Sequence, residues 1–336
     1  EEESEEESSE EESEEESEEE SEEESSEEES EEESSEEEFR ALQKTILTLH
    51  HLKNSNYKAA EEAVSFLPNE GVHLYFKSIA LAWLNAQKIK PVGAKSALSN
   101  LPRIRRDIKN PLEDITYGMT LDYLNDSEKA SNVYKEALSQ HMTLASALNV
   151  ANFFERHGDN DAAKKLYEDI FLMRPNHDLS LRKINALNKV NQTSLTIEPR
   201  IQSLNEGFGY SLLNLATFLF EQNSEETALV YAQMALEIAP TIDESWILVG
   251  DILSRLGQDK TAIRYYQHLA FKHDAVNATN ASLKLADLYH TLGQNNKTLE
   301  VLEHAQTQWP TNKDILLSKA NFQQQYNEAE TALELY

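Results

Sequence analysis

The sequence predicts an all-α protein built as a right-handed superhelix of antiparallel helix pairs, with no β-sheet. Two observations support this prediction. Apolar and small residues recur at a spacing of about 34 residues, which is typical of proteins made of stacked helical repeats. Short turns with Gly or Asn separate the expected helices, and Pro follows the second helix of several repeats. Both residue types end helices, Gly by accepting a left-handed conformation and Pro by lacking a donor.

The clearest repeat begins near Asp243 and combines two helical stripes. Apolar and small residues that recur every three or four positions predict one buried face on each helix. These residues are Trp246, Val249, Gly250 and Leu253 on the first helix, and Ala262, Tyr266 and Leu269 on the second.

Four other windows carry the same pattern. One match would be weak evidence, but five at a fixed spacing are strong evidence. The window that ends at Pro240 has Leu212, Leu215, Ala216, Leu219, Ala228, Ala232 and Ala235 in these slots. The others have Tyr117, Gly118, Leu121, Ala130, Tyr134 and Ala137; Val150, Ala151, Phe154, Ala163, Tyr167 and Pro175; and Leu285, Ala286, Tyr289, Leu302, Ala305 and Pro310.

Each slot has a physical requirement. Positions are counted within a repeat, with Asp243 as the first residue of the clearest one. The eighth position needs Gly or Ala because the two helices of a repeat cross there, and a larger side chain would hold them apart. The twentieth is small for the same reason, and we expect the aromatic near the twenty-fourth to fill space between neighbouring repeats. The turns are expected at HGDN (157–160), LGQD (256–259) and LGQN (292–295).

This pattern resembles the tetratricopeptide repeat family over residues 41–336. The stretch from Gly207 to Pro240 is similar to multi-repeat members of alphaproteobacterial type, which are usually exported. The resemblance therefore implies a bacterial periplasm or envelope, and a role in holding other proteins. Members that grip a chaperone's C-terminal carboxylate use Lys at the fifth position, where this chain has Leu or Ile. We therefore expect no chaperone-tail recognition.

The chain divides into five predicted segments. Residues 1–38 form a Glu/Ser arm, 39–110 degenerate helix pairs, and 111–190 repeats followed by a lone helix. Residues 191–206 include Pro199 and are expected to break the solenoid, and 207–336 form the second block of repeats. A last second helix is expected to begin near Glu328, so that the final repeat is incomplete at Tyr336.

The arm carries most of the net charge. Residues 1–38 contain 27 Glu and 11 Ser, and the other 34 acidic residues nearly balance 30 Lys and Arg. With no apolar residue to bury and with like charges that repel, this arm is expected to be disordered. The rest of the chain is only mildly acidic.

The sequence offers no chemistry for catalysis or a cofactor. It contains no Cys, no Gly-rich phosphate loop and no nucleophile elbow, and adjacent His50 and His51 lack ligand spacing. The protein is therefore predicted not to be an enzyme and to bind no metal or cofactor. The basic cluster at 103–109 is short and the arm would repel phosphate, so nucleic-acid binding is not expected. No apolar run is long enough to span a membrane.

Two functions remain open. The first is a scaffold that binds a peptide or helix of a protein partner in the concave groove of the solenoid. The second is an acidic chaperone for a strongly basic protein, acting through the Glu/Ser arm. Deleting the arm would separate them, because only the second requires it.

The groove of the second block is the predicted binding surface. Its repeats match the pattern best, it follows the expected break, and it carries aromatics that the core does not need. The competing interpretation is that Phe220 packs under the irregular 191–199 segment. The predicted groove residues are Tyr210, Leu213, Thr217, Phe220, Ile247, Asp251 and Arg255.

Overall fold

A computed structural model describes residues 36–90, 111–138, 142–173, 178–188, 197–272 and 277–335. The regular structure of these residues is helical throughout, which confirms the predicted fold class. The chain forms two compact units, the first ending at Lys77 and the second beginning at Ser78. The predictions for most of the acidic arm, for the basic cluster at 103–109 and for residues 191–196 lie outside the described residues.

The first unit contains a helix over residues 36–53, α2 (Tyr57–Ser65) and the beginning of α3 (Gly71–Ile89). Its core includes the fully buried Leu52, Val64 and Phe76. The helix starts no later than residue 36, so the arm predicted to reach residue 38 is wrong in its last three residues. Arg40 pairs with Glu36 at 2.8 Å, one helical turn apart, which favours helix over this acidic end.

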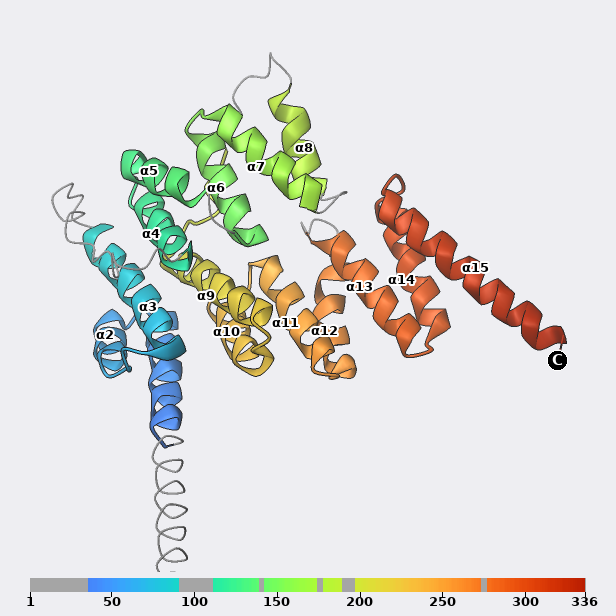
Figure 1. Ribbon diagram of the computed structural model, residues 1–336, viewed down its shortest axis with the longest axis horizontal. Helices are drawn as coiled ribbons and strands as arrows, with labels where there is room; N and C mark the ends of the chain where they lie inside the picture. The colour runs from blue at the N-terminus through green and yellow to red at the C-terminus, as the bar shows by residue number, and fades with distance from the viewer. Residues whose placement is uncertain are drawn as a thin grey trace, which may run out of the picture. The chain divides into compact units, whose positions relative to one another are not determined.

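The second unit contains all five predicted helix pairs (Figure 1). In each pair, the first helix packs against the second across a short turn. The pairs are α4 (Pro111–Tyr123) with α5 (Ser127–Ala137), α6 (Leu144–Arg156) with α7 (Asn160–Met173), α9 (Leu204–Glu221) with α10 (Glu225–Ile238), α11 (Asp243–Arg255) with α12 (Asp259–Ala270), and α13 (Ala278–Thr291) with α14 (Asn295–Gln308).

A left-handed residue closes the first helix of each of these pairs. Gly257 (φ +71°) does so between α11 and α12, as the LGQD motif predicts. Asn223 (φ +59°) takes the same place between α9 and α10, where the sequence has no Gly. Asn tolerates this conformation better than most residues, because its short side chain can hydrogen-bond locally. The turns at Asn125, Gly158 and Gly293 follow the same rule.

The helix crossing explains the small residue at the eighth position. A Cβ atom added to Gly250 would lie 2.5 Å from Cε1 of Tyr266, and one added to Gly118 would lie 2.4 Å from Cε1 of Tyr134. In both cases the aromatic ring comes from the second helix of the same repeat. The expectation that this aromatic fills space between neighbouring repeats holds for Tyr134, whose ring centre lies 5.0 Å from that of Phe153 in the next repeat. The structure adds that the ring also packs directly on the glycine of its own pair.

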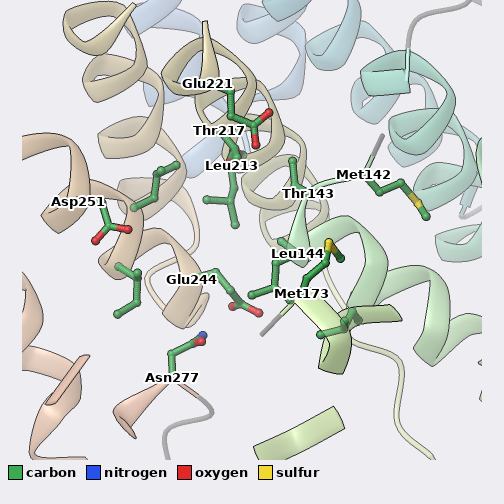
Figure 2. Close-up of a pocket in the computed structure, with 14 residues that line it drawn as sticks. Met142, Thr143, Leu144, Met173, Leu213, Thr217, Glu221, Glu244, Asp251 and Asn277 are labelled. Carbon is green, nitrogen blue, oxygen red and sulfur yellow. The ribbon is translucent and has the colours of Figure 1, made fainter. Parts of the chain in front are cut away.

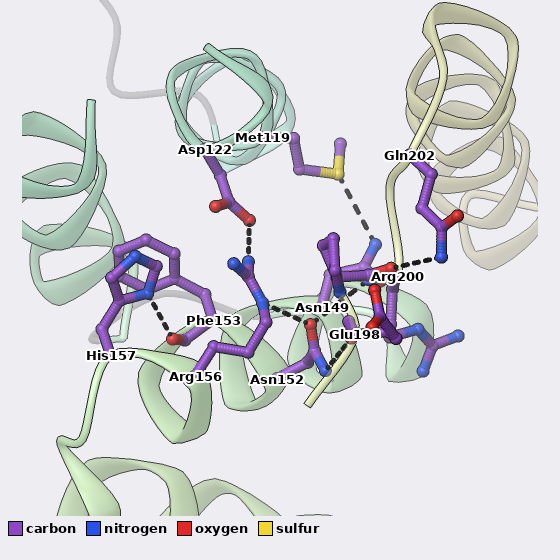
Figure 3. Close-up of polar contacts among 11 residues, drawn as sticks. Met119, Asp122, Asn149, Asn152, Phe153, Arg156, His157, Glu198, Arg200 and Gln202 are labelled. Atoms are coloured by element: carbon purple, nitrogen blue, oxygen red, sulfur yellow. Dashed lines mark hydrogen bonds and ion pairs between the residues drawn. The ribbon is translucent and has the colours of Figure 1, made fainter. Parts of the chain in front are cut away.

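The predicted break turns the chain back onto earlier helices. Asn152 of α6 donates to the carbonyl of Glu198 at 3.1 Å and accepts from the backbone N–H of Arg200 at 3.3 Å (Figure 3). The same side chain accepts from Nε of Arg156, whose guanidinium pairs with Asp122 of α4. These contacts attach the segment before α9 to α6, and Arg156 connects the same side chain to α4.

The second block therefore does not simply continue from α8 (Asp178–Leu187), which packs against α7. Instead, α9 packs against α4 and α6. Trp83, near the end of α3, is fully buried and donates its indole N–H to Oγ of Ser211 at 2.9 Å. Its ring lies on Gly207, where a Cβ would come within 1.9 Å of the indole.

The last described helix, α15 (Lys313–Leu335), is continuous. The separate second helix expected to begin near Glu328 is therefore wrong. The stretch from Gln323 to Leu335 contains neither Gly nor Pro. It does contain Asn327, a residue type that closes two of the other helices, but α15 continues through it.

Candidate functional site

A groove opens in the second unit where the two blocks of repeats meet, and we name it the junction groove. It lies between α6 and α7 on one side and α9 and α11 on the other, with a volume of about 220 Å³ (Figure 2). The groove exists because the break places α9 beside α6. Its walls therefore come from segments that are far apart in the sequence.

Four of the seven predicted groove residues line it. Leu213 and Thr217 come from α9, and Ile247 and Asp251 come from α11. They are spaced four residues apart on each helix, so each pair presents one face to the groove. Leu213 and Ile247 are mostly buried and form its floor, while Thr217 and Asp251 are partly exposed.

Tyr210 lies outside the groove, in the core beside the break. Its side chain is only 6% exposed, and its hydroxyl accepts from Nη2 of Arg200 at 2.9 Å. The same guanidinium nitrogen donates to Glu244 at 2.6 Å. Burial raises the pKa of Tyr210 to about 12, although Arg200 opposes that shift. Tyr210, which the sequence predicts on the groove surface, is thus held in the core by its hydrogen bond to Arg200.

Phe220 and Arg255 also lie outside the residues that line the groove, and they contact each other. The guanidinium of Arg255 lies 4.0 Å from the centre of the Phe220 ring. Arg255 also bonds to Glu225 at 3.2 Å and to the side chain of Asn223 at 3.4 Å. This cluster joins the ends of α9 and α11. The interpretation that places Phe220 under residues 191–199 falls largely outside the described residues.

The sequence-based prediction missed the wall formed by α6 and α7. This wall contains Met142, Leu144, Ile170 and Met173. Thr143, the N-cap of α6, accepts from the backbone N–H of Ser146 at 3.1 Å and donates to Oδ1 of Asn214 on α9 at 2.7 Å. That bond joins the two walls. A Thr before a helix predicts a cap, but no local signal predicts its partner 71 residues away.

Three carboxylates line the other wall: Glu221, Glu244 and Asp251. Glu244 is held by Arg200, and Asp251 accepts from the hydroxyl of Tyr266 at 2.7 Å and from Lys284 at 2.8 Å. Burial and the Asp251 charge raise the pKa of Tyr266, so its hydroxyl stays a donor. Two of the three carboxylates are thus fixed in position by neighbours behind the groove.

The described residues offer little for other kinds of site. They contain no group of three or more His, Asp or Glu side chains arranged to hold a metal ion. None of their helices combines the length and apolar character needed to cross a membrane. The groove volume of about 220 Å³ is also below the roughly 300–1,000 Å³ that is usual for small-molecule sites.

Comparison with known proteins gives likenesses to solved structures alone, since no family model and no curated protein matches the chain. YrrB, a TPR protein with an unusual peptide-binding site, is 19% identical and matches 68% of this chain and 100% of its own, with a TM-score of 0.33. The assembly chaperone of RpL4 (Acl4) is 15% identical over 67% and 99%, with a TM-score of 0.33. The TPR2AB domain of yeast Sti1 in complex with pHSP90 is 13% identical over 86% and 98%, with a TM-score of 0.29.

Because these TM-scores lie below 0.5, the likenesses do not establish the repeat type of this chain. The packing of its own helices does. Within each block the helix pairs begin 33 residues apart (α4 to α6), 39 apart (α9 to α11) and 35 apart (α11 to α13), near the period of 34 that tetratricopeptide repeats have. They have Gly or Ala at the crossing and a left-handed turn between the helices. The fold is a tetratricopeptide-type α-solenoid. In this solenoid, the first helices α6, α9 and α11 supply most of the junction groove.

Proposed function

We propose that this protein is a non-enzymatic scaffold that binds a peptide or helical segment of a partner protein in the junction groove. The observation that carries the proposal is the composition of the groove: apolar side chains from two blocks of repeats with three carboxylates at one side. Recognition of peptides by helical grooves uses this combination, with apolar anchors for affinity and charged groups for specificity.

The size of the groove supports a macromolecular ligand over a free small molecule. A volume of about 220 Å³ accommodates one or two side chains but little of a drug-sized compound. A peptide would seat an anchor there and extend its remaining contacts along the neighbouring helices. Few side chains carry most of the energy in such interfaces, so a small pocket is sufficient for binding.

The experiment that tests the proposal selects peptides from a random displayed library on the full-length chain and then fills the groove. Thr217→Trp places a bulky neutral side chain between the walls from a partly exposed position on α9. Thr307→Trp, on the exposed face of α14, is the matched control. We expect the selected peptides to lose at least tenfold in affinity for Thr217→Trp alone, with unchanged helical circular dichroism in both variants.

The acidic-chaperone alternative gives a different result in the same assay. If the Glu/Ser arm is the binding element, Thr217→Trp leaves peptide affinity unchanged, and removing residues 1–35 abolishes it. That outcome would overturn the groove proposal. Loss of binding in Thr217→Trp with retention after removal of the arm would support it.

A further inference from the structure

All three carboxylates of the junction groove lie on one of its two walls, and the other wall carries none. Figure 2 shows Glu221, Glu244 and Asp251 on the side of α9 and α11, and Met142, Leu144 and Met173 on the side of α6 and α7. The side of α9 and α11 also contributes Leu213, Ile247 and Leu248 to the lining. A ligand that fills the groove must therefore present different chemistry to the two sides.

The acidic wall favours a cation. Among the described residues that line the groove there is no Lys, Arg or His. The cations that pair with Glu244 and Asp251 are Arg200 and Lys284, and neither belongs to that lining. These two pairs fix the carboxylates in position. Each carboxylate has two oxygens and can accept several hydrogen bonds, so it can also accept from a ligand ammonium or guanidinium.

The apolar wall favours a large aliphatic or aromatic side chain. Met173 is 63% exposed at the end of α7, and Met142 and Leu144 are half-buried at the start of α6. Methionine is flexible and polarisable, so a wall with two methionines can adjust to anchors of different shape. Covering this exposed apolar surface with a ligand is favourable, because it removes the surface from water.

We infer that the junction groove takes an amphipathic cationic segment of a partner protein. Its Lys or Arg side chain faces the carboxylates of α9 and α11, and its large apolar side chain faces Met173 and Leu144. This inference rests on the proposed function and specifies its ligand. A segment of the opposite charge would place its carboxylates against Glu221 and against Glu244 and Asp251, whose charges Arg200 and Lys284 already offset in part. The remaining repulsion is the element that gives the interface specificity.

The test uses three short fluorescent peptides that differ in one property each. The first has Lys and Leu on opposite faces, the second replaces Lys with Glu, and the third replaces Leu with Ser. Affinity for the full-length chain is measured by fluorescence anisotropy. Because the acidic arm also attracts a cationic peptide, groove binding is defined as the part of the signal that Thr217→Trp removes. We expect groove binding for the Lys/Leu peptide and at least tenfold weaker groove binding for the other two.

Two surface variants test the two walls separately. Glu221→Lys reverses one charge of the acidic wall, and Glu226→Lys makes the same change at an exposed position of α10 that does not line the groove. Met173→Ser removes apolar surface from the other wall. Its control is Leu317→Ser, where Leu317 is 61% exposed on α15 and also does not line the groove.

We expect Glu221→Lys and Met173→Ser each to weaken groove binding of the Lys/Leu peptide about tenfold or more, and the controls to change it little. Glu221→Lys should also improve binding of the Glu/Leu peptide. If Thr217→Trp removes as much binding of the Glu/Leu peptide as of the Lys/Leu peptide, the inference is overturned while the groove proposal stands. If Thr217→Trp changes the binding of no peptide, including those selected from the library, the proposed function fails as well.

Discussion

The crossing of α11 and α12 gives the sharpest test of the packing. Gly250 leaves no room for a side chain, because a Cβ there would lie 2.5 Å from Cε1, 2.9 Å from Cδ1 and 2.9 Å from Cζ of Tyr266. Gly250→Ala gains about 1 kcal/mol from the better helix propensity of Ala. Overpacking of a tight core costs about 1–3 kcal/mol. The expected net result is a destabilisation of up to about 2 kcal/mol.

Tyr266 cannot move away without a cost of its own. Its hydroxyl donates to Asp251 at 2.7 Å, and its ring is almost fully buried. Shifting the ring would break that hydrogen bond and pull on one carboxylate of the groove. The methyl group of Gly250→Ala should therefore be accommodated by a shift of α12, not by rotation of the ring.

A double-mutant cycle isolates the clash. Tyr266→Leu removes the ring, so Gly250→Ala in that background should cost little and could be stabilising by its propensity gain. The coupling free energy should be about 1–3 kcal/mol, since the residues are in contact. Urea unfolding followed by circular dichroism measures all four proteins. A Gly250→Ala protein more stable than the parent, with no coupling to Tyr266, would refute the packing described for this repeat.

Two further predictions concern the contacts that bring the blocks together. Trp83→Ala should lower the free energy of unfolding, measured by urea titration, by about 3–5 kcal/mol, because it empties a fully buried site against Gly207. The control is Trp246→Ala, which should lower it less because Trp246 is only half-buried. Burial raises the pKa of Tyr210 to about 12, so the unfolded state loses its proton first as pH rises above about 10, and stability falls. This loss should amount to about 2–3 kcal/mol of unfolding free energy by pH 12, and the Tyr210→Phe protein should lack it. Urea unfolding of the parent and of Tyr210→Phe at stepped pH measures it, and a parallel decline in the two proteins would contradict the prediction.

The repeats were predictable because their causes are local. The spacing of Gly118 and Tyr134 matches that of Gly250 and Tyr266, and in both repeats the ring lies on the glycine. Gly at 257 predicts its own turn, since few other residues take a positive φ. The details that failed had no local signal. The continuity of α15 through Glu328 does not follow from the period alone, and neither does the packing of Tyr266 on the glycine of its own repeat.

The candidate site was predictable only in part, for the same reason. Leu213, Thr217, Ile247 and Asp251 reach the groove because helical periodicity places them on one face of α9 or α11. Periodicity also placed Tyr210 on that surface. Arg200, from the break, instead holds its hydroxyl in the core.

The sequence by itself determined that this protein is a solenoid of helix pairs with a break before the second block. Only the tertiary structure decided what the break does. Asn152 holds the returning segment, Trp83 packs on Gly207, and Thr143 bonds to Asn214 across the groove. These contacts join residues that are many positions apart, where no period relates them. The apolar wall of α6 and α7 therefore faces the acidic wall of α9 and α11 through pairings that a repeat pattern does not encode.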